Sequence, residues 1–65
     1  MNNNWSVVFS TDDIFQADVI KNMLDANNID AIIMNQKDSA YLFGIVKIYT
    51  KKENIEKAKN LILNE

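Results

Sequence analysis

The feature that most limits how this chain can fold is the absence of both cysteine and histidine from its 65 residues. A chain this short buries only about 60% of the surface that it exposes when unfolded, so many small domains depend on disulfides or bound metal. Without cysteine or histidine, disulfides and a structural zinc site are excluded. Apolar packing must therefore stabilise the fold, and 48% of the residues are hydrophobic. We expect one domain over residues 1–65, in which residues 1–4 form a disordered or frayed leader.

The missing residue types also limit which catalytic and binding reactions the chain can carry out. There is no thiol nucleophile, no Ser-His-Asp triad and no imidazole to bind a metal. All seven basic residues are lysines, so the chain has no guanidinium for bidentate binding of phosphate. The net charge of −2 has the wrong sign for ordinary nucleic-acid binding. We expect a protein that is not an enzyme, with no catalytic residue, no cofactor, no metal site and no nucleic-acid partner.

The hydropathy pattern also predicts where the protein resides. No apolar stretch approaches the about 20 residues that a membrane-spanning helix needs. The segment Met1-Asn2-Asn3-Asn4 has neither the basic region nor the apolar core of a secretion signal. We therefore expect a cytoplasmic protein without membrane contact.

The first half of the chain predicts a strand followed by a helix. Alternation over residues 5–10 puts Trp5, Val7 and Phe9 on one face, with Ser6, Val8 and Ser10 on the other. Ser10 or Thr11 supplies a capping oxygen for a helix over about residues 12–27, and Asp12 and Asp13 suit the positive end of its dipole. The apolar side chains of this helix cover an arc of roughly 200°, wide enough for one edge to contact the sheet and the other a second helix or a partner. Asn27-Asn28 ends the helix, because asparagine tolerates the left-handed conformation.

The second half predicts two strands and a second helix. The strands span residues 29–34 and 42–50, separated by a polar loop at residues 35–41. Val46 and Ile48 belong to the buried face of the later strand, and Gly44 within it suggests a bulge or a close backbone approach. Thr50 and Glu53 have the spacing of a capping box for a helix that ends near Leu63.

These elements predict an α+β domain with a ferredoxin-like βαββα order. A short hairpin makes the third strand antiparallel to the second, and its natural position between the first two gives a three-stranded antiparallel sheet of order 1-3-2 with two helices on one face. The opposite face and the outer edge of the first strand have no predicted cover. Exposed apolar surface of this kind marks a contact site, so we expect a homo-oligomer, in the first instance a homodimer. The candidate interface residues are Val8, Ile32, Met34, Ile45 and Tyr49.

Several segments resemble a small bacterial family of unknown function, named "putative prokaryotic signal-transducing protein". The resemblance covers nearly the whole chain, and the stretch Lys37-Asp38-Ser39-Ala40-Tyr41 is its most specific part. The other segments are Phe9-Ser10-Thr11-Asp12-Asp13, Ala17-Asp18, Asn28-Ile29-Asp30-Ala31, Asn35-Gln36, Val46-Lys47-Ile48-Tyr49-Thr50 and Glu56-Lys57-Ala58. The resemblance implies a fold similar to that of the PII nitrogen-regulatory proteins, and a role in signal transduction.

Nucleotide binding, which PII-like proteins show, is not expected of this chain. Its loop between the second and third strands has about seven residues, and it lacks both arginine and a glycine-rich phosphate cradle. That loop supplies a candidate recognition site, formed by Lys37, Asp38, Ser39 and Tyr41. The alternative interpretation is structural: Asp38 and Ser39 shape the turn, and Tyr41 packs over the base of the hairpin.

Two functions from different classes are consistent with these features. The first is a non-enzymatic interaction or regulatory module, which acts by homo-oligomerisation and by binding a protein partner. The second is a sensor domain that binds a small metabolite near the 35–41 loop or in a dimer cleft.

Overall fold

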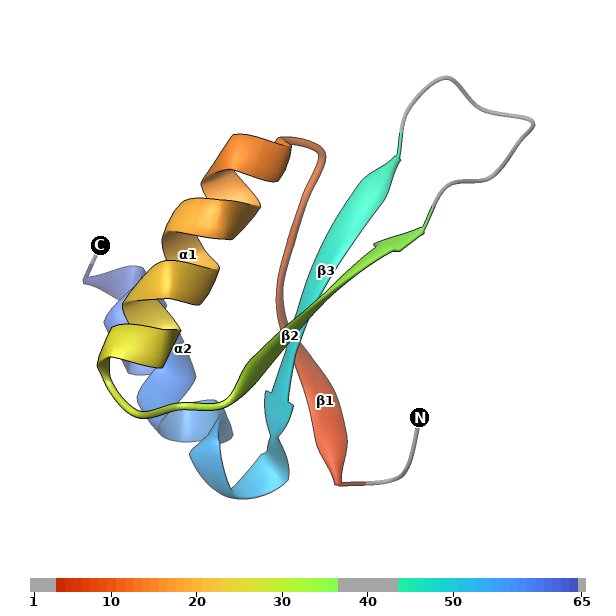
Figure 1. Ribbon diagram of the computed structural model, residues 1–65. Helices are drawn as coiled ribbons and strands as arrows, with labels where there is room; N and C mark the ends of the chain where they lie inside the picture. The colour runs from red at the N-terminus through yellow and green to blue at the C-terminus, as the bar shows by residue number, and fades with distance from the viewer. Residues whose placement is uncertain (1–3, 37–43, 65) are drawn as a thin grey trace.

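The computed structural model describes residues 4–36 and 44–64 of the chain. Three strands, two α-helices and one 3₁₀ turn follow one another along it (Figure 1). They are β1 (Trp5–Thr11), α1 (Ile14–Ala26), β2 (Ala31–Gln36), β3 (Ile45–Lys51), η1 (Lys52–Asn54) and α2 (Ile55–Leu63).

The strands form one antiparallel sheet in the order β1-β3-β2. Because β3 is antiparallel to both of its neighbours, β1 and β2 run parallel and α1 is the crossover between them. Both helices lie on the same face of the sheet (Figure 1). The predicted α+β, ferredoxin-like βαββα fold of strand order 1-3-2 is therefore confirmed.

The hydrophobic core lies between this face and the helices. Its buried members come from α1, from the segment between α1 and β2, from β3 and from α2; they are Ala17, Ile20, Leu24, Ile29, Val46, Ile48 and Ala58. Val46 and Ile48 were predicted on the buried face, and alternation along β3 accounts for this. The same alternation sends Ile45, Lys47 and Tyr49 to the other side of the sheet.

The start of α1 is held by a short network of side chains. Asp13 is the N-cap residue, and its Oδ1 accepts hydrogen bonds from the backbone N–H groups of Phe15 (2.9 Å) and Gln16 (3.4 Å). Thr11 Oγ1 accepts from the Asp13 N–H (3.1 Å) and donates to Gln16 Oε1 (2.7 Å). These bonds satisfy donors that an uncapped helix leaves without partners.

The end of α1 is a Schellman motif. Asn28 has a φ of 63°, in the left-handed region. The backbone N–H of Ile29 donates to the Leu24 carbonyl, and that of Asn28 to the Asp25 carbonyl, both at 3.0 Å. Leu24 and Ile29 are both buried, which supplies the apolar contact that accompanies this motif. The helix ends at Asn27-Asn28 as predicted, and β2 begins at Ala31 rather than Ile29 because the motif occupies the intervening residues.

Because of a β-bulge in β1, the predicted facing of that strand is wrong for residues 5–8 and correct for Phe9 and Ser10. Val7 pairs with Tyr49 but Phe9 pairs with Ile48, so Val8 is an extra residue in the ladder. Val8 was predicted on the uncovered face, yet it packs against the core, while Val7 is 39% exposed. Gly44, for which a bulge or a close backbone approach within the third strand was predicted, lies outside any described strand, just before β3.

The predicted capping box at the second helix is also wrong. Thr50 lies within β3, its side chain is fully buried, and its Oγ1 has no hydrogen-bond partner in the described part of the chain. The chain continues through η1 before α2 begins, and the residue before α2, Asn54, makes no side-chain cap. Thr50 pairs with residues of β1 and β2, so it belongs to strand β3 and is not the N-cap of α2.

Candidate interaction surface

The sheet face that points away from the helices is the main candidate for a functional surface. No described element packs against it. We call it the open face, and it comprises Trp5, Val7 and Ser10 of β1, Ile32 and Met34 of β2, and Ile45, Lys47, Tyr49 and Lys51 of β3, with Asp30 beside them. Directly paired residues on neighbouring strands share a face, so the register alone defines this set.

An apolar row crosses the middle of the open face. Tyr49 is paired with Val7 on one side and with Ile32 on the other. Tyr49 is half-buried between these neighbours, and Ile32 is 40% exposed. Cross-strand aromatic and β-branched neighbours stabilise a sheet by about 0.2–1 kcal/mol per pair. The row therefore supports the sheet and still leaves apolar surface accessible.

The adjoining row brings a positive charge into this apolar surface. Lys47 lies between Ser10 and Met34. Met34 is 38% exposed, and Ile45 at the start of β3 is 52% exposed. A lysine stem covers apolar neighbours while its ammonium group stays in water. The apolar residues of the open face thus surround a central cation.

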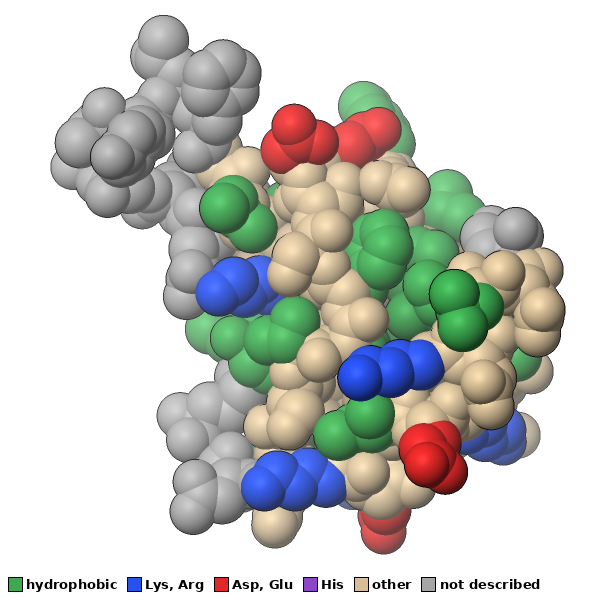
Figure 2. Space-filling view, turned by 180° about the vertical axis from the view of Figure 1, so that it is seen from behind, with side chains coloured by type: hydrophobic (Ala, Val, Ile, Leu, Met, Phe, Trp, Pro, Cys, Tyr) green, Lys and Arg blue, Asp and Glu red, His purple; other side chains and the backbone are tan. Residues whose placement is uncertain are grey.

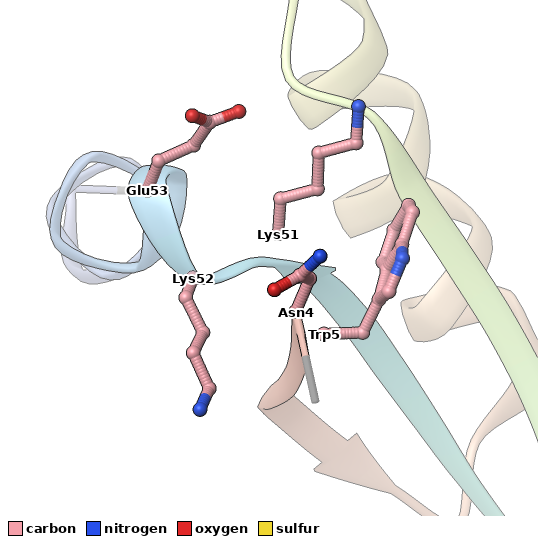
Figure 3. Close-up of a pocket in the computed structure, with 5 residues that line it drawn as sticks. All are labelled: Asn4, Trp5, Lys51, Lys52 and Glu53. Carbon is pink, nitrogen blue, oxygen red and sulfur yellow. The ribbon is translucent and has the colours of Figure 1, made fainter. Parts of the chain in front are cut away.

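The opposite end of the open face holds a three-residue contact. Lys51 Nζ lies 5.9 Å from the centroid of the Trp5 ring and 3.5 Å from Asp30 Oδ2. Beside it lies a hollow of about 550 Å³ lined by Asn4, Trp5, Lys51, Lys52 and Glu53, in which the Lys51 stem runs alongside the indole (Figure 3). Cation–π contacts at exposed sites contribute about 0.5–1 kcal/mol. This contact orients Trp5, an amphipathic residue type that is enriched at protein interfaces.

The outer edge of β1 was the second surface predicted to be open. β1 pairs with β3, and no described strand pairs with its other edge. Figure 2 shows the molecule from behind, and on this side the hydrophobic side chains are interrupted by lysines and backbone. The bulge at Val8 disrupts the regular spacing of backbone groups along β1. Bulges on edge strands hinder the addition of a further strand, so the open face is the better surface for association.

The five predicted interface residues divide between the two faces of the sheet. Ile32, Met34, Ile45 and Tyr49 lie on the open face, and Val8 is the one that the bulge moves to the core side. Val7 was not among the predicted interface residues, because an alternating pattern of side chains does not indicate that a strand contains an extra residue. It also placed Trp5 with the buried set, whereas the register with Lys51 puts it on the open face. Whether these residues bind a partner stays a prediction.

The other predicted site is the recognition loop. The candidate recognition residues Lys37, Asp38, Ser39 and Tyr41 lie outside the described residues.

Neither described helix is long and apolar enough to cross a bilayer. Within residues 4–36 and 44–64, acidic side chains do not gather in groups of three or more that could hold a metal ion.

The fold and the open face define a small ferredoxin-like domain, in which three described strands form a sheet with one face that no described element covers. The chain belongs to the family described as "Putative prokaryotic signal transducing protein", whose model matches residues 5–65. The match confirms the resemblance seen in the sequence, and the family's name refers to signal transduction. Comparison with curated proteins and with solved structures finds no match.

Proposed function

We propose that this chain is a non-enzymatic interaction module of signal transduction, which self-associates and binds a protein partner through its open face. The observation that carries the proposal is the exposure of four large apolar side chains on one uncovered sheet face, Val7, Ile32, Met34 and Ile45. Apolar surface gathered in this way marks a contact site in soluble proteins. The expectation that the chain is not an enzyme rests on its lack of histidine, cysteine and arginine.

The size of the open face favours a reversible contact. A standard interface buries about 800 Å² on each partner. That area would be about one sixth of the 4730 Å² surface of this domain. A face of three strands, spaced about 4.8 Å apart and seven residues long, projects over only about 340 Å². Association through this face alone therefore belongs to the small, transient class of interfaces that signalling proteins use.

The bulge in β1 favours association through the face over association through the strand edge. An added strand needs a continuous row of backbone donors and acceptors, and the extra residue Val8 interrupts that row. Contacts through the open face use side chains instead, and these lie in regular rows across the three strands.

Sedimentation velocity over micromolar to millimolar concentrations tests the proposal. The weight-average mass is expected to rise above the 7.5 kDa of one chain as concentration increases. Ile32→Lys places a charge in the central apolar row and is expected to weaken association. Leu63→Lys is the matched control, because Leu63 is an 81% exposed apolar residue on α2, away from the open face.

A single 7.5 kDa species at every concentration would contradict self-association. A thermal-shift screen with nucleotides, amino acids and 2-oxoacids then tests the small-ligand sensor. A saturable rise in melting temperature with one compound class would favour the sensor over the interaction module, because a ligand that binds only the folded state stabilises it.

A further inference from the structure

Helix α1 carries a second apolar surface, which faces away from the core. Its buried residues Ala17, Ile20 and Leu24 contact the sheet side. At 100° per residue, Phe15 and Val19 lie about 180° and 140° around the helix axis from Leu24. Phe15 is 78% exposed and Val19 is 53% exposed. We call these two residues the α1 stripe, and no contact within the core explains them.

Negative charge borders the α1 stripe. Asp12 and Asp18 are exposed and form no ion pair with any described residue. The neighbouring Asp25 is instead paired with Lys21 at 2.7 Å. The α1 stripe therefore offers two apolar side chains beside two carboxylates that form no ion pair with any described residue.

The open face is positively charged, opposite in sign to the carboxylates beside the α1 stripe. It carries Lys47 in its centre and the Lys51–Asp30 pair at one end, so it holds one net positive charge among apolar side chains. Two open faces in contact would bring their like charges together. An open face against an α1 stripe brings opposite charges together and buries apolar surface on both sides.

We infer that the open face of one copy receives the α1 stripe of a second copy, an inference that rests on the proposed function. A helix is the ordinary cover for a sheet face, as α1 and α2 show on the inner side of this sheet. The contact places Phe15 and Val19 of one copy on the Val7–Tyr49–Ile32 row of the other. One interface thus accounts for both exposed apolar surfaces.

Such a contact joins two different surfaces, and this determines how it assembles. After the first contact forms, one copy still has a free α1 stripe and the other still has a free open face. Head-to-tail association therefore continues into a ring or an open chain, whereas contact between two identical surfaces stops at a dimer. The distribution of oligomers thus distinguishes the two arrangements.

The test uses two variants that each damage one surface. Phe15→Ser removes the main side chain of the α1 stripe, and Ile32→Ser removes one from the central row of the open face. Leu63→Ser is the control for both, and circular dichroism checks that all three variants stay folded. Each of the two test variants alone is expected to raise the dissociation constant of self-association by about tenfold or more, and Leu63→Ser to leave it unchanged.

Mixing the two variants gives the decisive measurement. The Ile32→Ser chain keeps its α1 stripe and the Phe15→Ser chain keeps its open face, so only one productive contact is possible. Sedimentation of the mixture is expected to show a 1:1 heterodimer and no larger species. If Ile32→Ser abolishes association and Phe15→Ser does not, two open faces bind each other, which overturns this inference and leaves the proposed function standing. If the unmodified chain never associates, both fail.

Discussion

Thr50 offers a direct test of how this small core is stabilised. Its side chain is 0% exposed, and its Oγ1 has no hydrogen-bond partner in the described part of the chain. Burying a hydroxyl without a partner costs about 1–3 kcal/mol. Valine has nearly the same shape, with a methyl group in place of the hydroxyl, and it suits a β-strand at least as well. We therefore expect Thr50→Val to stabilise the domain.

The expected gain in the free energy of unfolding is about 1–2 kcal/mol. For a domain of this size, 1 kcal/mol corresponds to a change of about 4–8 °C in Tm. Urea denaturation followed by circular dichroism measures the gain, and the midpoint is expected to rise by about 1 M with an unchanged slope. Thr50→Ser is the matched variant, because it keeps the hydroxyl and loses the methyl group. It is expected to destabilise the domain by about 1 kcal/mol.

The opposite result for Thr50→Val would refute the reasoning. A loss of 1 kcal/mol or more on this substitution would show that the hydroxyl is hydrogen-bonded in solution, for example to Ser6, which lies directly opposite it on β1. An unchanged slope in urea is needed for either conclusion, because a changed slope signals a different unfolded or native ensemble.

Three further variants test the elements that define the fold. Asn28→Gly is expected to have a Tm equal to or above that of the unmodified chain. Asn28→Ala is expected to lower the free energy of unfolding by about 1 kcal/mol, because alanine is disfavoured at the φ of 63°. Equal stability of the two variants would contradict a left-handed conformation at residue 28. Asp13→Ala is expected to cost about 0.5–2 kcal/mol in urea denaturation through loss of the cap on α1, and Asp12→Ala, the adjacent control, much less. Leu24→Ala is expected to cost about 2–5 kcal/mol, roughly half or more of the about 3–10 kcal/mol available to a chain of this length, so its Tm should fall sharply in thermal denaturation followed by circular dichroism. An unchanged Tm would show that Leu24 is not central to the core.

The parts of the fold that depend on neighbouring residues were predictable from the sequence. The start of α1 near residues 10–13 and its end at Asn27-Asn28 depend on residues within one helical turn, so the residue types alone indicate them, although the N-cap is Asp13 and not the predicted Ser10 or Thr11. The alternation of Val46 and Ile48 likewise determines which side of β3 is buried. Once the order of elements is known, the short hairpin and the crossover helix leave few topologies, and the 1-3-2 sheet follows.

The candidate surface was predictable only where its strands are regular. Ile32, Met34 and Ile45 lie on the open face because β2 and β3 alternate without interruption. β1 does not, and the bulge exchanged the expected places of Val7 and Val8. A bulge results from pairing with β3, which lies about 40 residues away in the sequence, so no local pattern within β1 could indicate it.

Thr50 and the α1 stripe show the same division between local and tertiary effects. Thr50-Lys51-Lys52-Glu53 has the sequence of a capping box, but pairing with β1 and β2 orders Thr50 as strand and buries it. The wide apolar arc of α1 was evident from its periodicity, yet periodicity could not say which edge the core would use. Packing against the sheet selected Ala17, Ile20 and Leu24 and left Phe15 and Val19 exposed. Residue types close together in the sequence therefore determine the order of the elements and where each begins and ends. Which side chains stay exposed depends instead on contacts between segments distant in the chain, because burial is decided by what packs against each face.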